Sequence, residues 1–173
     1  IKMAAPDRDV YVMVGDGSYL MMNSEIVTSI QEHYKLIIVL LDNDGFKSIG
    51  SLSRSLGQDG FGTRYVYPHN GVLPDDTVGA EARTLPVNLA ANAHSLGAHV
   101  IECKTRADFS AALQEARGID RTTVIYIRND RYAGIPAYEG WWDVPVAEVS
   151  AMPQVESSRA QWTEMRAHER YFL

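Results

Sequence analysis

The chain has 173 residues, of which 46% are hydrophobic and 22% charged, and its 16 basic and 22 acidic side chains give a formal net charge of −6. This length suits about one domain that can bury a core without disulfides or metals as staples. The acidic balance argues against nucleic acid or an anionic membrane as a partner. A diphosphate ligand remains compatible with it, because backbone amides and a metal can bind phosphate without basic side chains.

Several features favour a reducing compartment. The single cysteine, Cys103, has an apolar context, which predicts a buried thiol and no disulfide framework. The longest apolar run, Leu36 to Leu41, is far too short to span a membrane, and no secretory signal is visible. The chain opens at Ile1 without an initiator Met. We therefore expect a cytoplasmic domain from a longer polypeptide, with no membrane partner.

Four short runs rich in Val and Ile lack period-two alternation, which is typical of parallel strands covered on both faces. They are Val10–Val14, Leu36–Leu41, His99–Cys103 and Thr123–Ile127. Strands separated by helical patterns favour an α/β fold, with an open, mostly parallel sheet and helices on both faces.

Helical patterns fill the connections between these strands. Tyr19, Met22, Ile26 and Ile30 recur at spacings of three and four and predict one helix after the first strand. A second helix is predicted from Pro86 to Leu96. A third is predicted to open at Thr105, with Asp108 as its capping-box partner.

Two regions depart from this alternation. Asp44 to Leu85 spans 42 residues with seven glycines and no clear element, which predicts a functional loop. After residue 130 the chain becomes a tail with a polar helical stretch from about Val155. We therefore predict a domain over residues 1–130 and a tail over 131–173 that packs on the domain or on a subunit interface.

The segment Val12–Ser18, which reads VMVGDGS, carries the chemistry. A strand ends at Gly15 and a helix opens directly after it, so exposed amides create an anion site there. Asp16 would repel an anion unless a cation lay between them, and carboxylate with phosphate oxygens suits Mg²⁺. Asn43 reaches the same edge of the sheet, 43 − 16 = 27 residues later. Taken alone, Gly-Asp-Gly is a common turn.

Together these features resemble the GDG…N signature of thiamine-diphosphate enzymes. The resemblance implies a diphosphate-binding domain in which Asp16, Asn43 and the carbonyl of Gly45 hold Mg²⁺. It also implies thiamine diphosphate as cofactor and a homo-oligomer in which a second subunit supplies the pyrimidine-binding domain. That absent domain would carry the activating glutamate, so no catalytic residue is assigned here and the chain alone is expected to be inactive. The positions expected to contact the cofactor are Gly15, Asp16, Gly17, Ser18, Asn43, Gly45 and Phe46.

Five further segments are similar to one branch of this family, the trihydroxycyclohexane-1,2-dione hydrolases of myo-inositol catabolism. They read GDGSYLMMNSEIVTSIQE, LLDNDGFKSIG, FGTRY, LPVNLAANAHSLGA and WWDVPVAEVS. The resemblance implies hydrolysis of a carbon–carbon bond in a cyclic dione, a small-molecule substrate. Two other functions stay open at this point: an acetolactate-synthase-like carboligase acting on 2-oxo acids, and a non-catalytic interaction domain in which GDG is only a turn.

Overall fold

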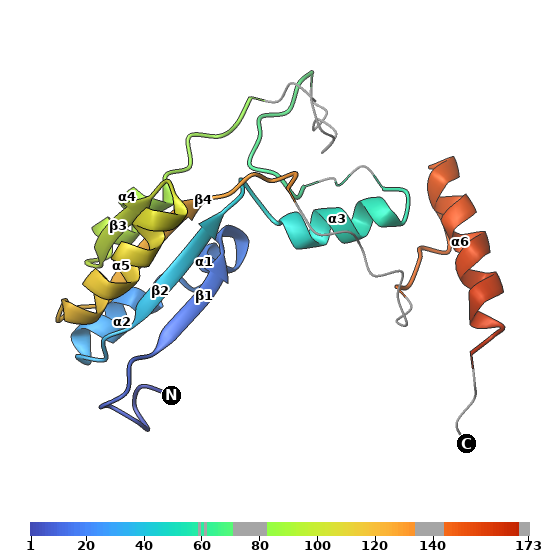
Figure 1. Ribbon diagram of the computed structural model, residues 1–173. Coiled ribbons are helices and arrows are strands. Elements are labelled where there is room, and N and C mark those ends of the chain that lie inside the picture. Colours follow the sequence, from blue (N-terminus) through green and yellow to red (C-terminus); the bar gives the residue numbers. More distant parts are fainter. Residues whose placement is uncertain (59, 61, 71–82, 134–143, 170–173) are drawn as a thin grey trace. The chain divides into compact units, whose positions relative to one another are not determined.

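The computed structural model describes residues 1–58, 60, 62–70, 83–133 and 144–169 (Figure 1). Phe61 of the FGTRY segment and the Trp141–Trp142 pair lie outside these residues. The chain divides into two compact units, which are described separately below. Unit 1 comprises Ile1–Phe46 and Leu85–Arg131, and unit 2 comprises Lys47–Thr84 and Tyr132–Leu173. The predicted division into residues 1–130 and 131–173 stays a prediction.

Unit 1 is built on a parallel sheet of four strands in the order β1-β2-β4-β3. The strands are β1 (Tyr11–Gly15), β2 (Ile37–Asp42), β3 (His99–Cys103) and β4 (Thr123–Arg128). In the register, Gly15 pairs with Leu41 and Leu41 pairs with Ile127. The carboxyl ends of β1, β2 and β4 therefore lie level at one edge, and the predicted open parallel α/β fold is confirmed.

Helices cover both faces because successive strand residues point to opposite sides. Ile38, Leu40 and Val124 pack with α1 (Asp16–Met22), α2 (Glu25–Gln31) and α4 (Leu89–Ser95). Ile37 and Ile125 pack with α5 (Arg106–Gly118) on the other face, which is the near face in Figure 1. Cys103 is buried on this second face, as the sequence predicts.

Two helix predictions need correction in their extent. The single helix predicted from Tyr19 to Ile30 is two helices, because the chain breaks at Asn23 and Ser24. Asn23 is a poor helix former, and its side chain donates a hydrogen bond to Asn92 Oδ1 over 3.0 Å. The second predicted helix begins at Leu89, later than Pro86, because the Asn88 side chain caps it through the N–H of Ala91.

Unit 2 contains α3 (Lys47–Ser55) and α6 (Pro153–Arg166). The prediction that 44–85 lacks a clear element was wrong for α3, whose sequence KSIGSLSRS contains four serines and a glycine of low helix propensity. Helix α6 confirms the helical stretch predicted from about Val155. Among the described residues, no helix has the length and apolar character needed to cross a bilayer.

Candidate functional site

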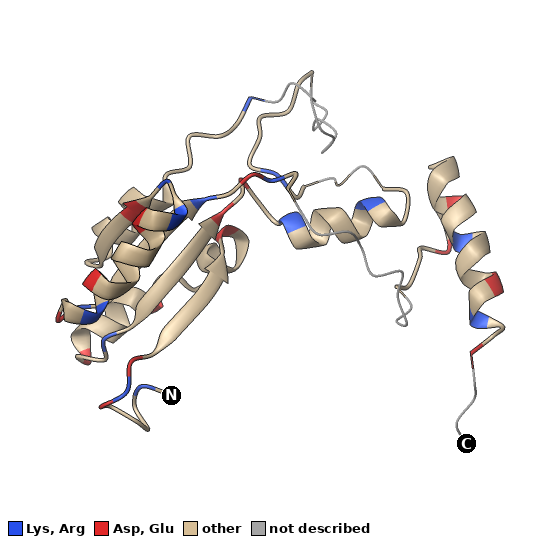
Figure 2. Cartoon of the chain, in the orientation of Figure 1, with Lys and Arg blue, Asp and Glu red and all other residues tan. Residues whose placement is uncertain are grey.

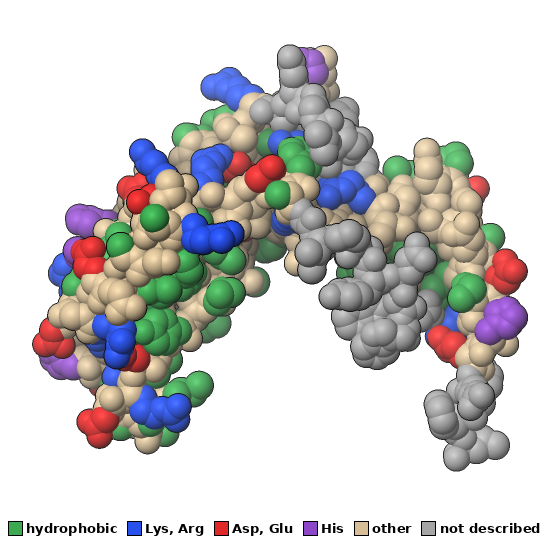
Figure 3. All heavy atoms as spheres, viewed as in Figure 1, with side chains coloured by type: hydrophobic (Ala, Val, Ile, Leu, Met, Phe, Trp, Pro, Cys, Tyr) green, Lys and Arg blue, Asp and Glu red, His purple; other side chains and the backbone are tan. Residues whose placement is uncertain are grey.

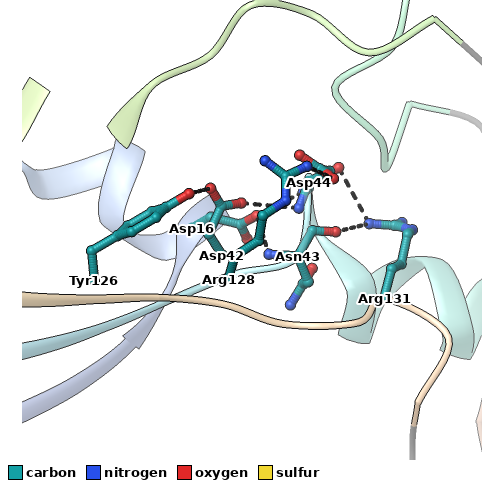
Figure 4. A network of polar contacts seen from close by, with 8 residues as sticks. Asp16, Asp42, Asn43, Asp44, Tyr126, Arg128 and Arg131 are labelled. Carbon is teal, nitrogen blue, oxygen red and sulfur yellow. Dashed lines mark hydrogen bonds and ion pairs between the residues drawn. The ribbon is translucent and has the colours of Figure 1, made fainter. Parts of the chain in front are cut away.

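Asp16 lies where β1 ends and α1 begins, and the residue is 1% exposed. Its Oδ1 accepts a hydrogen bond from the N–H of Gly17 at 2.8 Å. Its Oδ2 accepts two more, from the N–H groups of Asn43 at 3.0 Å and Gly45 at 2.8 Å. One side chain therefore joins the end of β1 to the turn that follows β2 (Figure 4).

Burial sets the electrostatics of this carboxylate. Desolvation raises the pKa of Asp16, and the hydrogen bonds from Gly45, Asn43 and Gly17 oppose that shift. The neighbouring carboxyl of Asp42 raises the pKa further. A buried carboxylate whose charge is disfavoured in this way favours a cation beside it, because opposite charge stabilises the ionised form.

Asn43 places a second oxygen at the same edge of the sheet. Its Oδ1 is buried and has no hydrogen-bond partner in the described part of the chain. The backbone after it is unusual, with Asp44 at φ 60° and Gly45 at φ 138°, both in the region that favours glycine. A buried polar atom without a partner calls for an explanation, and an ion is one of the recognised ones.

The glycines of the motif have different surroundings. A Cβ on Gly17 would lie 2.5 Å from Cδ1 of the Phe46 ring, so only glycine lets this ring pack against the start of α1. A Cβ on Gly15 would meet no described atom within 4 Å. The backbone of Gly15 is extended, a conformation open to any residue. Neither packing nor conformation explains glycine there, whereas close approach of a ligand would. Ser18 follows Gly17 in the first turn of α1, and its side chain is exposed.

Three residues that the sequence analysis did not assign also take part. The first two, Tyr126 and Arg128, each contact an aspartate at the end of β2 or in the turn after it. The hydroxyl of Tyr126 donates to Asp42 Oδ2 at 2.5 Å, and burial together with this carboxyl raises the pKa of Tyr126. The guanidinium of Arg128 pairs with Asp44 Oδ2 at 2.6 Å, and this carboxylate raises the pKa of Arg128.

The third of these residues, Arg131, donates to the main-chain carbonyls of Asn43 at 3.0 Å and Asp44 at 3.3 Å. Sequence position could have suggested these residues, because Tyr126 and Arg128 are among the last three residues of β4 and Arg131 follows that strand. Figure 2 shows the resulting mixture of acidic and basic positions at the end of β2.

These residues fit a hard divalent cation. A carboxylate offers about four lone-pair directions, and the three N–H groups on Asp16 leave room for one more bond. Carboxylate and amide oxygens are ligands that Mg²⁺ accepts. Among the described residues, no group of three or more His, Cys, Asp or Glu side chains could hold a metal. A cation at this edge would therefore depend on the mixed set of oxygens that Asp16 and Asn43 provide.

A family model decides where the chain belongs. Residues 1–127 match the model described as "Thiamine pyrophosphate enzyme, C-terminal TPP binding domain". The chain belongs to this family. The matched residues include the whole GDG motif and Asn43, and they end within β4. The family resemblance predicted from the motif is thereby confirmed, and with it the assignment as a domain that binds thiamine diphosphate.

Curated relatives of this TPP-binding domain are considerably longer. The chain is 35% identical over 157 residues to 3D-(3,5/4)-trihydroxycyclohexane-1,2-dione hydrolase 2 of a Bacillus cereus strain. It is 34% identical over 157 residues to 3D-(3,5/4)-trihydroxycyclohexane-1,2-dione hydrolase of Bacillus thuringiensis (strain Al Hakam). Each alignment covers 91% of this chain and 24% of the relative. The chain thus spans about a quarter of the length of the curated relatives it matches.

Solved structures share the fold of the domain. Benzoylformate decarboxylase from Polynucleobacter necessarius matches with a TM-score of 0.58 and 17% identity, over 77% of this chain and 22% of that one. The thiamine diphosphate-dependent 4-hydroxybenzoylformate decarboxylase of Rhodococcus jostii RHA1 matches with a TM-score of 0.56 and 22% identity, over 75% and 21%. At these identities the likeness shows a common fold and leaves the reaction open.

Proposed function

We propose that the domain binds thiamine diphosphate together with Mg²⁺ at the carboxyl ends of β1 and β2. Asp16, Asn43 Oδ1 and the carbonyl of Gly45 would hold the metal, and the positions around them would contact the cofactor. The cofactor-contacting positions in this proposal are Gly15, Asp16, Gly17, Ser18, Asn43, Gly45 and Phe46.

The observation that carries the proposal is that two buried oxygen groups at this edge of the sheet lack the interactions that would offset the cost of their burial. Asp16 is buried with a raised pKa, and the Oδ1 of Asn43 is buried without a partner among the described residues. Leaving the buried Asn43 oxygen unpaired costs on the order of 1–3 kcal/mol. A divalent cation would compensate both at once, because it stabilises the carboxylate charge and accepts the amide oxygen as a ligand.

Each residue would then have a defined task. The three backbone N–H groups on Asp16 fix the orientation of its carboxylate, so the metal would meet a preorganised ligand. The N-cap residue Gly15 has no side chain to compete with a phosphate for the first-turn amides, of which the N–H of Gly17 is bound by Asp16 Oδ1. Phe46 lies against Gly17 and would shield that end of the site from water. The cofactor, when bound, supplies the carbanion-stabilising chemistry, and the protein supplies binding and orientation.

For the complete protein, we propose hydrolysis of a carbon–carbon bond in trihydroxycyclohexane-1,2-dione. Support comes from the two relatives named above, both trihydroxycyclohexane-1,2-dione hydrolases, which are 35% and 34% identical over 91% of this chain. The activating glutamate would reside in a pyrimidine-binding domain from a second subunit of a homo-oligomer, and the chain alone would be inactive. We also propose that the protein acts in the cytoplasm.

Exposed apolar side chains support a further protein contact on unit 1. Tyr11 and Met13 of β1 are 48% and 74% exposed, and Met21 and Met22 of α1 are 68% and 64% exposed. Figure 3 shows hydrophobic side chains gathered on the visible face of this unit. Exposed apolar side chains in such numbers are typical of interaction sites.

The test of the binding proposal is calorimetric titration of the complete natural protein with thiamine diphosphate, with and without Mg²⁺. We expect Mg²⁺-dependent binding by the parent and its loss in Asp16→Ala, because a site with so few protein oxygens has little redundancy. Undiminished affinity in Asp16→Ala would refute the proposal. The matched control is Asp108→Ala, since Asp108 also lies in the first turn of a helix that follows a strand and should not affect binding.

The test of the reaction compares substrates on the loaded protein. Turnover of the cyclic dione together with inactivity on 2-oxo acids would support the hydrolase. The reverse result would indicate a carboligase or lyase instead. If Mg²⁺ does not affect cofactor binding and neither substrate is turned over, an interaction domain would be favoured.

A further inference from the structure

The turn over residues 43–45 is held from two sides. Its three N–H groups are bound by carboxylates, those of Asn43 and Gly45 by Asp16 and that of Asp44 by Asp42 Oδ1 at 3.0 Å. Its first two carbonyls accept from Nη1 of Arg131, at 3.0 Å and 3.3 Å. Asp44 has φ 60°, a conformation that is unfavourable for most residues other than glycine. Such a turn persists only where its surroundings enforce it.

Arg131 and Arg128 approach this turn in different ways. The Arg128 side chain is 59% exposed and pairs with the carboxylate of Asp44, a surface contact that weakly constrains the backbone. Arg131 is 6% exposed and bonds the backbone itself. Burying a guanidinium is costly unless it is hydrogen-bonded, so its placement here fixes the carbonyls to which it donates. Figure 4 shows Arg131 directed at the turn from the segment after β4.

This arrangement distinguishes the two oxygens of Asn43. The main-chain oxygen is taken by Arg131, whereas Oδ1 is buried without a partner among the described residues. We propose that Arg131 is a positioning residue for the metal site: it ties back the carbonyls of Asn43 and Asp44, so that Asn43 presents its Oδ1 to the cation. This inference rests on the function proposed above.

Charge and geometry predict opposite effects of removing Arg131. A guanidinium near a divalent cation repels it, so charge alone predicts tighter Mg²⁺ binding in Arg131→Met. Positioning predicts weaker binding, because Mg²⁺ demands near-ideal octahedral geometry. Outer-shell groups that orient metal ligands typically change metal affinity by about 10- to 100-fold. Arg131→Lys separates the two effects, because it keeps the charge and loses the planar fork of donors.

The experiment measures Mg²⁺ and Ca²⁺ affinity of the complete natural protein at saturating thiamine diphosphate, by calorimetry. We expect Mg²⁺ binding about 10- to 100-fold weaker in Arg131→Met, with Arg131→Lys between Arg131→Met and the parent. The ratio of Mg²⁺ to Ca²⁺ affinity should also fall, because Ca²⁺ tolerates irregular geometry. A role in stability alone would leave this ratio unchanged. Arg117→Met, which removes a guanidinium that pairs with Asp9 on the surface of unit 1, should match the parent.

Two results would overturn the inference: unchanged or tighter Mg²⁺ binding in Arg131→Met, or weaker binding with an unchanged Mg²⁺ to Ca²⁺ ratio. Asp16→Ala, measured in parallel, identifies which proposal has failed. If Asp16→Ala abolishes Mg²⁺-dependent cofactor binding while Arg131→Met behaves as the parent, only the positioning role is refuted. If Asp16→Ala binds as the parent does, the metal site itself is refuted.

Discussion

Two strand-to-helix junctions of unit 1 use an aspartate in the first turn of the helix, with opposite results. At the β3–α5 junction, Asp108 Oδ2 accepts the N–H groups of Lys104 and Thr105, and the Thr105 hydroxyl accepts the N–H of Asp108 in return. These hydrogen bonds lower the pKa of the exposed Asp108. At the β1–α1 junction, Asp16 also accepts backbone hydrogen bonds, yet its pKa is raised.

The two pKa shifts differ in sign because the two aspartates differ in burial and in the backbone groups that they bind. Asp108 faces solvent and bonds its own helix start, so its charge is stabilised by local amides and by water. Asp16 is buried, lies near the carboxyl of Asp42, and directs two of its hydrogen bonds to the turn after β2. One junction therefore completes a helix, whereas the other joins two strand ends and leaves a buried charge that favours a cation.

The largest expected effect concerns two asparagines of unit 1. Asn43→Ala should weaken Mg²⁺ affinity by more than about 100-fold, because loss of an outer-shell group alone costs about 10- to 100-fold. The same substitution should leave the cofactor-free protein as stable as the parent or more stable, since it removes a buried acceptor without a partner among the described residues. Metal titration and urea unfolding measure the two effects.

Asn92→Ala is the matched control for that prediction. Asn92 Oδ1 accepts hydrogen bonds from Tyr19 at 2.8 Å and Asn23 at 3.0 Å, and burial raises the pKa of Tyr19 to about 12. Its loss should destabilise the protein by about 1–3 kcal/mol, because it leaves the Tyr19 hydroxyl without an acceptor, and should leave Mg²⁺ affinity unchanged. The distinction between the two asparagines fails if both variants lose stability equally and neither loses metal affinity.

A smaller effect is expected from the glycines that flank Asp16. Gly17→Ala should destabilise the protein by about 1–3 kcal/mol, because the new Cβ would lie 2.5 Å from the Phe46 ring. Gly15→Ala should change stability by less than about 0.5 kcal/mol, since its Cβ would meet no described atom within 4 Å. If Gly15 admits a ligand, this variant should nevertheless bind thiamine diphosphate more weakly. Equal stability losses in urea unfolding would contradict the assigned packing.

The smallest expected effect is the pH dependence that Asp108 contributes. Because its folded pKa lies below the ordinary value of 3.8, Asp108 stabilises the protein at pH values above 3.8. This contribution should disappear as pH falls through the lower folded pKa. Asp108→Asn should therefore be less stable than the parent near neutral pH and converge with it in acid. Urea unfolding between about pH 6 and about pH 2.5 measures the difference, and a gap independent of pH would argue against ionisation as its cause.

Local sequence patterns were enough to predict the four strands of the sheet and the start of the capped helix α5. The runs of Val and Ile predicted all four strands, because strands covered on both faces need apolar side chains throughout. Thr105 and Asp108 predicted the start of α5, since a capping box involves residues only three apart. Helix α3 escaped prediction because its four serines and Gly50 have low helix propensity, which hid the helical spacing of Ile49 and Leu52.

By itself, the sequence determined that Asp16 and Asn43 follow parallel strands, and parallel strands bring their carboxyl ends to one edge. It also carried the motif that predicted the family, and the family match confirmed that family. Only the tertiary structure decided that Asp16 binds the amides of the turn, that Tyr126 bonds Asp42, and that Arg131 takes the carbonyls of Asn43 and Asp44. These contacts join residues 27 to 88 positions apart, and their geometry depends on strand order and register, which no local pattern encodes.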